Sequence, residues 1–291
     1  MRRESARKLG VLLALTALGL AFVVLSGCGS NARKASLGAS EGVDLYLRDS
    51  ADGSAEHWRS PDVKLDAPPY AEAPTTAEEF DRLRDEAAAA DETNRAYVVI
   101  RNRGTDAAED VRVTLYAGPA TTMLPRLDGQ PEGWVQLDPV KIDRIEPGGD
   151  SIVGFDLPRV AGHQCLVVTA GAPGDPAPAL DEPGDRAVVA SGNVTARNMD
   201  LTGGQLKDVL VVQNPTPTMG RATLEVRAPD SVRVSLGGVE SPVELEPGER
   251  RRLTVSVSSE TGAAADVTVS ESLESSESEA LRGGMTYLLR P

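Results

Sequence analysis

The sequence predicts an all-β protein that is built from two tandem β-sandwiches. Three observations indicate this fold class. Short runs rich in β-branched residues alternate apolar with polar positions, turns rich in Gly and Pro separate these runs, and the same order of runs and turns occurs twice in the 291 residues. Regular turn signals without helices between the strands are typical of sandwiches and argue against parallel α/β folds.

The chain begins with a segment organised like a secretory signal. Four basic residues and one acidic residue stand among the first eight positions, and an almost wholly apolar run covers residues 11–25. This run is shorter than the ~20 residues that cross a bilayer, and small residues follow it, as in cleaved signals. The stretch LSGC over residues 25–28 resembles the lipobox of bacterial lipoproteins. That resemblance implies cleavage before Cys28 and acylation of its sulfur and amine; the alternative is an ordinary cysteine that ends a membrane anchor.

The lipobox resemblance predicts a lipoprotein of the cell envelope that is attached to a membrane by palmitate-type chains on Cys28. Each buried lipid methylene contributes about 0.8 kcal/mol, so several chains hold a protein firmly. We expect residues 1–27 to be the signal peptide and residues 28–42 to be a flexible tether. Gly29 favours the outer membrane if the organism has one, and otherwise we expect the outer face of the cell membrane.

The charge balance excludes two classes of partner. The full chain carries a net charge of −14 at pH 7, and the basic excess of the signal segment makes the processed chain more acidic still. A strongly acidic chain has no electrostatic reason to bind nucleic acid or an anionic membrane surface. With Cys28 acylated, Cys165 has no disulfide partner, and its place in the apolar run QCLVV predicts an inert core cysteine.

One short helix is expected within the first sandwich. The stretch TAEEFDRLRDEAAAA over residues 76–90 begins with Thr76 and carries Glu79 three positions later, which is the form of a capping box. Three apolar residues fall on one helical face: Phe80, Leu83 and Ala87. The alternative is a charged, partly disordered loop.

Strand patterns fill the remainder of the chain. In the first half they cover residues 43–47, two runs within 96–117, 151–157 and 164–170. The Pro/Gly/Asp-rich stretch at 171–185 is the best domain boundary, so we expect sandwiches over residues 43–172 and 186–291.

The second half repeats the first in outline. IEPG at 145–148 matches LEPG at 245–248, and each precedes an alternating strand. The run 208–228 mirrors 96–117, and the first half carries an insertion at about 119–137. We interpret the three arginines at 250–252 as a solvated strand edge, and the acidic stretch 271–284 as a mobile loop before a last strand at 285–289.

The stretch YVVIRNRG at 97–104, the alternating strand at 111–116 and the IEPG turn together resemble the bacterial immunoglobulin-like domains of the CARDB, or cell-adhesion-related, type. Segments 44–63 and 162–168 also resemble parts of exported bacterial proteins that carry such domains. The resemblance covers most of 43–170 and, more weakly, 190–290. It implies immunoglobulin-like sandwiches that act in adhesion, interaction or spacing, and it supplies no catalytic residues.

The residues offer little to catalysis or to metals. The chain has only two histidines, His57 and His163, and it has no nucleophile elbow, phosphate loop or CxxC motif. We therefore expect no enzyme activity, no cofactor and no metal site. Asp49 and Asp52 are weak calcium candidates because calcium prefers several oxygen ligands from acidic loops. The alternative for this loop is a solvated acidic turn.

Trp134 lies in the insertion and is our candidate partner contact, because Trp is enriched where proteins bind one another. The alternative places this ring in the sandwich core. The sequence thus predicts a non-enzymatic, lipid-anchored binding, adhesion or spacer module whose partner is an envelope protein or polymer. The alternatives are an accessory subunit of an envelope assembly and, more remotely, a hydrolase.

Overall fold

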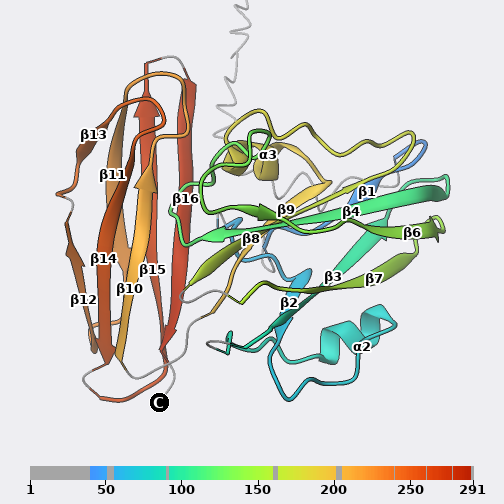
Figure 1. Cartoon of the computed structure of the whole chain (residues 1–291), viewed down its shortest axis with the longest axis horizontal. Coiled ribbons are helices and arrows are strands. Elements are labelled where there is room, and N and C mark those ends of the chain that lie inside the picture. Colours follow the sequence, from blue (N-terminus) through green and yellow to red (C-terminus); the bar gives the residue numbers. More distant parts are fainter. Residues whose placement is uncertain are drawn as a thin grey trace, which may run out of the picture.

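The structure is a computed structural model that describes residues 40–50, 56–89, 92–159, 163–200, 205–238, 240–259, 261–276 and 278–289. The predicted signal peptide, Cys28, most of the tether and Asp52 lie outside these ranges. Within them the chain forms two β-sandwiches side by side, which confirms the predicted all-β fold class (Figure 1). Neither helix in the described ranges combines the length and the apolar character that a membrane span requires.

The first sandwich packs two antiparallel sheets face to face. In one sheet β3 is central, with β1 and β2 along one side and β7 along the other. In the other sheet β4 and β8 are central, with β5 and β6 beside β4 and with β9 beside β8. The strands are β1 (Leu45–Tyr46), β2 (Val63–Asp66), β3 (Arg95–Asn102), β4 (Ala108–Pro119), β5 (Val135–Gln136), β6 (Val140–Ile145), β7 (Asp150–Asp156), β8 (Gln164–Gly171) and β9 (Val194–Asn198).

The second sandwich also has two antiparallel sheets. One has the order β10-β14-β12 and the other has the order β13-β11-β15-β16. Figure 1 shows β16 facing the first sandwich, and the strands of the two sandwiches run across one another. The strands are β10 (Gln205–Gln213), β11 (Gly220–Arg227), β12 (Val232–Gly237), β13 (Val243–Leu245), β14 (Arg250–Ser259), β15 (Ala265–Ser275) and β16 (Ser278–Leu289).

Alternation of side chains builds both cores. In β4, Val111, Val113 and Leu115 are fully buried while Arg112 between them is exposed. In β14, every second residue is likewise buried in the core: Leu253, Val255 and Val257. Full burial of one such side chain contributes about 1.5–3 kcal/mol. Both cores and their contacts lie within residues 43–289, so the chain from residue 28 onward retains them.

The predicted internal repeat is confirmed by two equivalent turns. Asn102 ends β3 and donates from Nδ2 to the last carbonyl of β6 at 3.1 Å, while Asn214 follows β10 and donates to the last carbonyl of β13 at 3.0 Å. The N–H groups of Gly148 and Gly248 donate to the carbonyls of these two asparagines, both at 2.8 Å. Both glycines have φ of +72°, which a residue with a Cβ rarely adopts.

The predicted helix at 76–90 is too long. The helix α2 covers only Ala77–Arg82, with Thr76 as its N-cap as expected. Lys64 Nζ donates to the carbonyls of Phe80, Asp81 and Leu83 and so caps the end of the helix. The following residues lie along β2, where Glu86 N–H donates to the Leu65 carbonyl at 3.0 Å. Pairing with this strand replaces the remaining helical turns.

Two further expectations are wrong. The first sandwich does not end at residue 172, because α3 (Gly184–Ala190) leads into β9, and β9 pairs with β8. The stretch 271–284 is not a loop, because β15 and β16 form a long hairpin through it. The hairpin forms because Leu273 and Leu281 face each other across the two strands and are both buried in the core.

Candidate functional site

The insertion at 119–137 joins the two sandwiches. It leaves β4 and meets the edge of β10, where Val211 N–H donates to the Ala120 carbonyl and Thr122 N–H donates to the Val211 carbonyl, both at 2.9 Å. The pairing at Thr121 and Val211 is parallel. Apolar residues of the insertion pack into the core that it shares with the second sandwich: Met123, Leu124, Leu127 and Trp134. The insertion is therefore a structural joint.

Two glycines in β16 let the sandwiches approach closely. A Cβ on Gly283 would overlap the carbonyl oxygen of Thr122, and a Cβ on Gly284 would overlap the indole of Trp58. The Gly284 carbonyl accepts a bond from Asn198 Nδ2 at 2.9 Å. Because backbone from one sandwich lies against backbone and ring from the other, only glycine fits at these two positions.

The first histidine forms a buried hydrogen bond at this joint. His57 Nε2 lies 2.7 Å from Asp185 Oδ1 in α3, and both side chains are almost fully buried. The other oxygen of Asp185 accepts the Leu124 N–H at 2.5 Å. The segment that carries His57 is held along β9, where Asn198 N–H donates to the Trp58 carbonyl at 3.0 Å. The pair thus fixes the insertion against α3.

The second histidine bridges the sandwiches. His163 Nδ1 lies 3.2 Å from Asp208 Oδ2 in β10, and the Tyr287 hydroxyl donates to the same oxygen at 3.2 Å. The His163 ring packs edge-to-face against Tyr287, with ring centroids 5.2 Å apart. Burial raises the pKa of Tyr287 above its ordinary value, and the negative charge of Asp208 raises it further. Tyr287 therefore stays a neutral hydrogen-bond donor.

A third buried group at the joint is a lone carboxyl. Glu271 in β15 is fully buried and accepts a hydrogen bond from the Thr122 hydroxyl. Its Oε1 has no hydrogen-bond partner in the described part of the chain. Burial raises the pKa of Glu271 to about 8, against the opposing effect of the Thr122 hydroxyl. The carboxyl therefore holds its proton at neutral pH, as an uncompensated buried charge would be costly.

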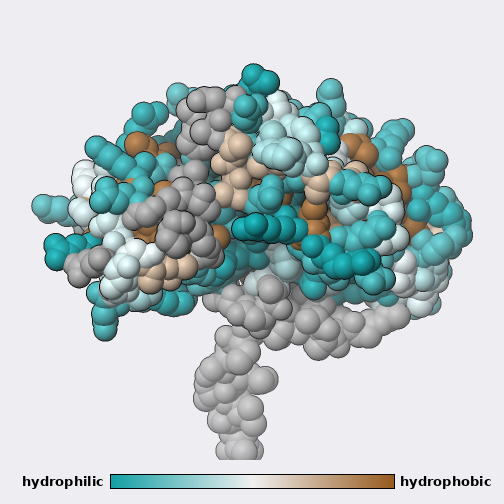
Figure 2. Space-filling model, turned by 90° about the horizontal axis from the view of Figure 1, so that it is seen from below, coloured by the Kyte–Doolittle hydropathy of each residue, from teal (hydrophilic) through white to brown (hydrophobic). Residues whose placement is uncertain are grey.

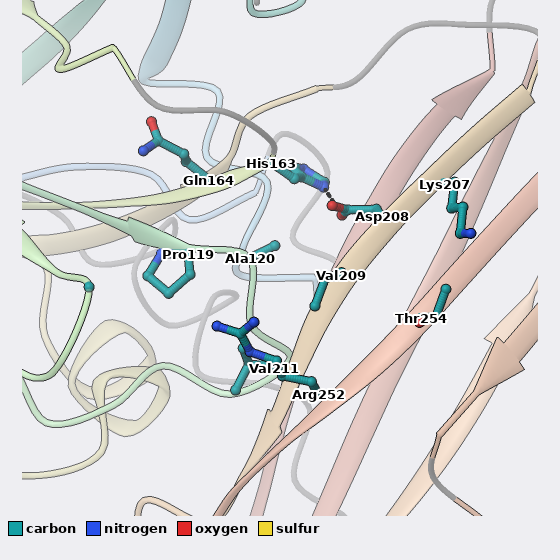
Figure 3. Close-up of a pocket in the computed structure, with 11 residues that line it drawn as sticks. Pro119, Ala120, His163, Gln164, Lys207, Asp208, Val209, Val211, Arg252 and Thr254 are labelled. Carbon is teal, nitrogen blue, oxygen red and sulfur yellow. Dashed lines mark hydrogen bonds and ion pairs between the residues drawn. The ribbon is translucent and has the colours of Figure 1, made fainter.

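Beside this joint lies a groove with a volume of about 600 Å³. Its floor is the outer face of β10 and β14, with Val209, Val211 and Thr254, and its wall comes from the first sandwich, with Pro119 and His163 (Figure 3). Its volume falls within the range of ligand pockets, roughly 300–1,000 Å³. A smaller cavity of about 380 Å³ adjoins it at Pro119 and Arg252. We call the first cavity the inter-sandwich groove.

The groove runs along an open sheet edge. Among the described strands, β10 is terminal in its sheet and pairs with β14, apart from the contact that the insertion makes at Val211. Val209, two residues before Val211, is 49% exposed although it is apolar. An open edge strand with an exposed apolar side chain is a surface that can pair with another chain.

The lining of the groove carries two cations and one carboxylate, Asp208, which is nearly buried and bonded to His163 and Tyr287. Lys207 and Arg252 are exposed, and neither forms an ion pair with any residue that the structure describes. Arg250 nearby lies 3.7 Å from the carboxylate of Glu132. The exposed charge of the groove is thus positive, although the whole chain carries a net charge of −14. It favours a ligand that carries negative charge.

The structure places the predicted site residues away from this groove or gives them other roles. Trp134 is only 8% exposed and its ring lies over Gly118, so it occupies the alternative core position and offers almost no surface to a partner. Asp49 is buried, and Asp52 and Cys28 lie outside the described residues. No group of three His, Cys, Asp or Glu side chains is placed to hold a metal ion within the described ranges.

Sequence reasoning did not find the groove residues. Val209 and Lys207 belong to an ordinary alternating strand, and only the sheet order shows that this strand is an edge. The three arginines at 250–252 were a visible signal, but β14 is the central strand of its sheet, so the interpretation as a strand edge is wrong. Arg252 instead extends over the groove from the neighbouring strand (Figure 3).

No family model and no curated protein matches the chain. Among solved structures, a mutant alpha-2-macroglobulin from Salmonella is similar over 71% of this chain, with 14% identity and a TM-score of 0.25. The native form of Escherichia coli alpha-2-macroglobulin is similar over 68% of this chain, with 14% identity and a TM-score of 0.24. The form of that protein activated by porcine elastase is similar over 88% of this chain, with 12% identity and a TM-score of 0.25. The chain spans 16%, 16% and 22% of the lengths of these three structures.

Proposed function

We propose that this chain is a lipid-anchored, non-enzymatic binding module of the bacterial cell envelope, and that its partner binds in the inter-sandwich groove. The signal segment and the lipobox resemblance at Cys28 support the anchoring. The all-β sandwich fold agrees with the resemblance to CARDB-type domains, whose members act in adhesion, interaction or spacing. The observation that carries the proposal is the groove beside the open edge of β10, with an exposed valine and two exposed cations that form no ion pair within the described residues.

The polar groups of the joint support a binding role over a hydrolytic one. Both histidines are buried and each faces an aspartate. His163 bridges the two sandwiches and His57 bonds Asp185 within the first one, so neither ring faces solvent. Burial raises the pKa of the Cys165 thiol to about 12, so this sulfur is not a thiolate at neutral pH. Among the described residues, the two histidines and the one cysteine thus offer neither a solvent-facing imidazole nor a thiolate nucleophile.

The coloured part of one face of the molecule also favours a localised site. The face in Figure 2 is mainly hydrophilic, and its hydrophobic residues form several separate patches. Extended apolar surfaces mark many interaction sites, so their absence from this face directs attention to the groove.

Partner capture from an envelope extract tests the proposal, with the chain from residue 28 onward as bait. Val209→Trp fills the groove, and Val226→Trp is the matched control because Val226 is also an exposed strand valine of the second sandwich, 38% exposed. We expect one partner to be retained by the wild type and by the control and lost with Val209→Trp. Deletion of 119–137 is unsuitable, because it removes Leu124 and Trp134 from the core.

Other outcomes would contradict the proposal. A partner retained equally by all three forms binds elsewhere, and retention of nothing by cooperatively folded wild type favours the accessory-subunit or spacer alternative. Turnover of generic ester, peptide or glycoside substrates would support a hydrolase. The anchoring is tested separately by labelled palmitate, which we expect to be incorporated by the full chain and not by Cys28→Ser.

A further inference from the structure

We infer that the inter-sandwich groove accepts an extended, acidic segment of a partner protein, which adds to the open edge of β10 as a further strand. The inference rests on the proposed function and names the chemistry of the partner. It follows from the backbone of β10, from the side chains beside it and from the place where the insertion already pairs with this edge.

The backbone of β10 is prepared for pairing on its open side. Val211 directs its N–H and C=O towards the insertion, where they bond with Ala120 and Thr122. Backbone groups in a strand alternate in direction with a period of two, so Val209 and Lys207 direct theirs to the same side. Their outward groups have no backbone partner among the described residues, while the intervening residues pair with β14.

The insertion shows that this edge accepts a strand and where an incoming strand must stop. Thr121 pairs with Val211 in parallel and occupies the C-terminal part of the edge. The open part therefore runs from Gln205 to Val209, which is five residues or about 17 Å at ~3.4 Å per residue. The groove, with a volume of about 600 Å³, lies alongside Lys207–Val209 of this part and continues to Val211.

The side chains define the chemistry of the incoming segment. Lys207, Val209 and Val211 share the outer face of β10, and Arg252 lies beside them on β14, opposite Val211. Alternate side chains of an added strand would face this surface, so one apolar residue can contact Val209 while acidic residues contact Lys207 and Arg252. Main-chain bonds supply affinity, and these side chains supply the preference for acidic sequences.

Charge also decides against a second copy of this chain. Antiparallel pairing of the open parts of two β10 strands, centred on Lys207, would place the two Lys207 side chains opposite each other, and like charges across a strand pair are destabilising. A partner segment with carboxylates satisfies both the backbone and the cations of the groove.

Synthetic peptides test the inference on the chain from residue 28 onward. The acidic probe has about eight residues, the length that spans the open edge with short overhangs, and alternates Val and Thr around two glutamates. A second probe carries lysines instead, and a third is the acidic probe with N-methyl groups on alternate amides. Binding is followed by fluorescence anisotropy, and hydrogen exchange reports protection of residues 205–209.

Three variants separate backbone pairing from charge. Val209→Pro removes an outward N–H and spares the ladder with β14, since Pro is tolerated on an edge strand. Lys207→Glu with Arg252→Glu reverses the groove charge, and Lys141→Glu is the control because Lys141 is exposed on β6, outside the lining of the groove. If Val209→Pro does not fold, the N-methylated probe still decides whether backbone pairing occurs.

We expect the acidic probe to bind the wild type and the Lys141 variant, to lose at least about tenfold in affinity on charge reversal and to fail with Val209→Pro. The lysine and N-methylated probes should bind at least about tenfold more weakly. Equal binding of the acidic and N-methylated probes, or no binding by the acidic probe at about 1 mM, would overturn the inference.

The outcome is distinguishable from failure of the proposed function. A captured partner that is lost with Val209→Trp but retained by Val209→Pro and by the charge reversal would leave the groove as the binding site and refute strand addition. A dimer in sedimentation analysis that Val209→Pro converts to monomer would identify a second copy as the occupant and overturn the acidic-partner inference.

Discussion

Replacement of Glu271 by Gln should stabilise the protein at neutral pH and remove the contribution of this carboxyl to the pH dependence of stability. The folded chain buries this carboxyl completely, and only Oε2 has a side-chain partner, the Thr122 hydroxyl across the joint. Burial raises the pKa of Glu271 from the ordinary value of 4.5 to about 8. Gln keeps the size of the side chain and cannot ionise.

The raised pKa fixes the sign of the effect. Between pH 4.5 and about 8 the folded state retains a proton that the unfolded state releases, so stability falls as the pH rises through this window. The stabilising contribution is complete below pH 4.5 and is lost as the pH approaches 8. At ~1.4 kcal/mol per pKa unit, the loss for the wild type reaches about 3 kcal/mol between pH 4 and pH 7.

Urea unfolding between pH 4 and pH 8.5 measures this effect. The free energy of unfolding of Glu271→Gln minus that of the wild type should rise with pH by about 3 kcal/mol up to pH 7 and level off above pH 8. Glu274→Gln is the control, because Glu274 lies on the same strand and is exposed. If the free energies of unfolding of Glu271→Gln and of the wild type differ by the same amount at every pH from 4 to 8.5, the reasoning is refuted.

Three further predictions concern the packing of the chain. Gly283→Ala places a Cβ on the Thr122 carbonyl and should cost about 1–3 kcal/mol of stability; a melting temperature as high as that of the wild type would contradict it. Asp62→Asn removes the buried negative charge that pairs with Arg48 and Arg101. It should lower the free energy of unfolding in urea by about 3–5 kcal/mol, and a loss under about 1 kcal/mol would contradict a structural role for this carboxylate. Cys165, with its pKa raised to about 12 by burial, should react with iodoacetamide at pH 8 only after unfolding, and rapid labelling of the native chain would show that the thiol is accessible.

Local patterns made much of the fold predictable. The alternation in β4 and β14 follows from the period of a strand, and the turns at Gly148 and Gly248 follow from a backbone conformation that glycine adopts readily. The internal repeat was visible because both halves use the same short signals. The equivalent roles of Asn102 and Asn214 show that the repeat extends to hydrogen bonds within the turns.

The remaining features depend on contacts that are distant in the sequence. Helix α2 ends early because Lys64, on another element, caps its carbonyls. The acidic stretch at 271–284 forms strands because its few leucines meet across a hairpin. The groove could not be predicted, because the open edge of β10 is a property of the sheet order and its wall belongs to the other sandwich. Both histidines gave a chemical signal, but their pairing with aspartates appears only in the fold.

The division of the groove between two sandwiches makes ligand affinity depend on how they are docked. The floor at Val209 and the wall at Pro119 keep their distance only while the joint at Thr122 and Gly283 is closed. Binding and docking are therefore linked equilibria: a ligand that fills the groove stabilises the closed joint, and a joint closed one-tenth of the time binds about tenfold more weakly. Under the proposed anchoring at Cys28, tension between the chain and the proposed partner would act directly on that equilibrium.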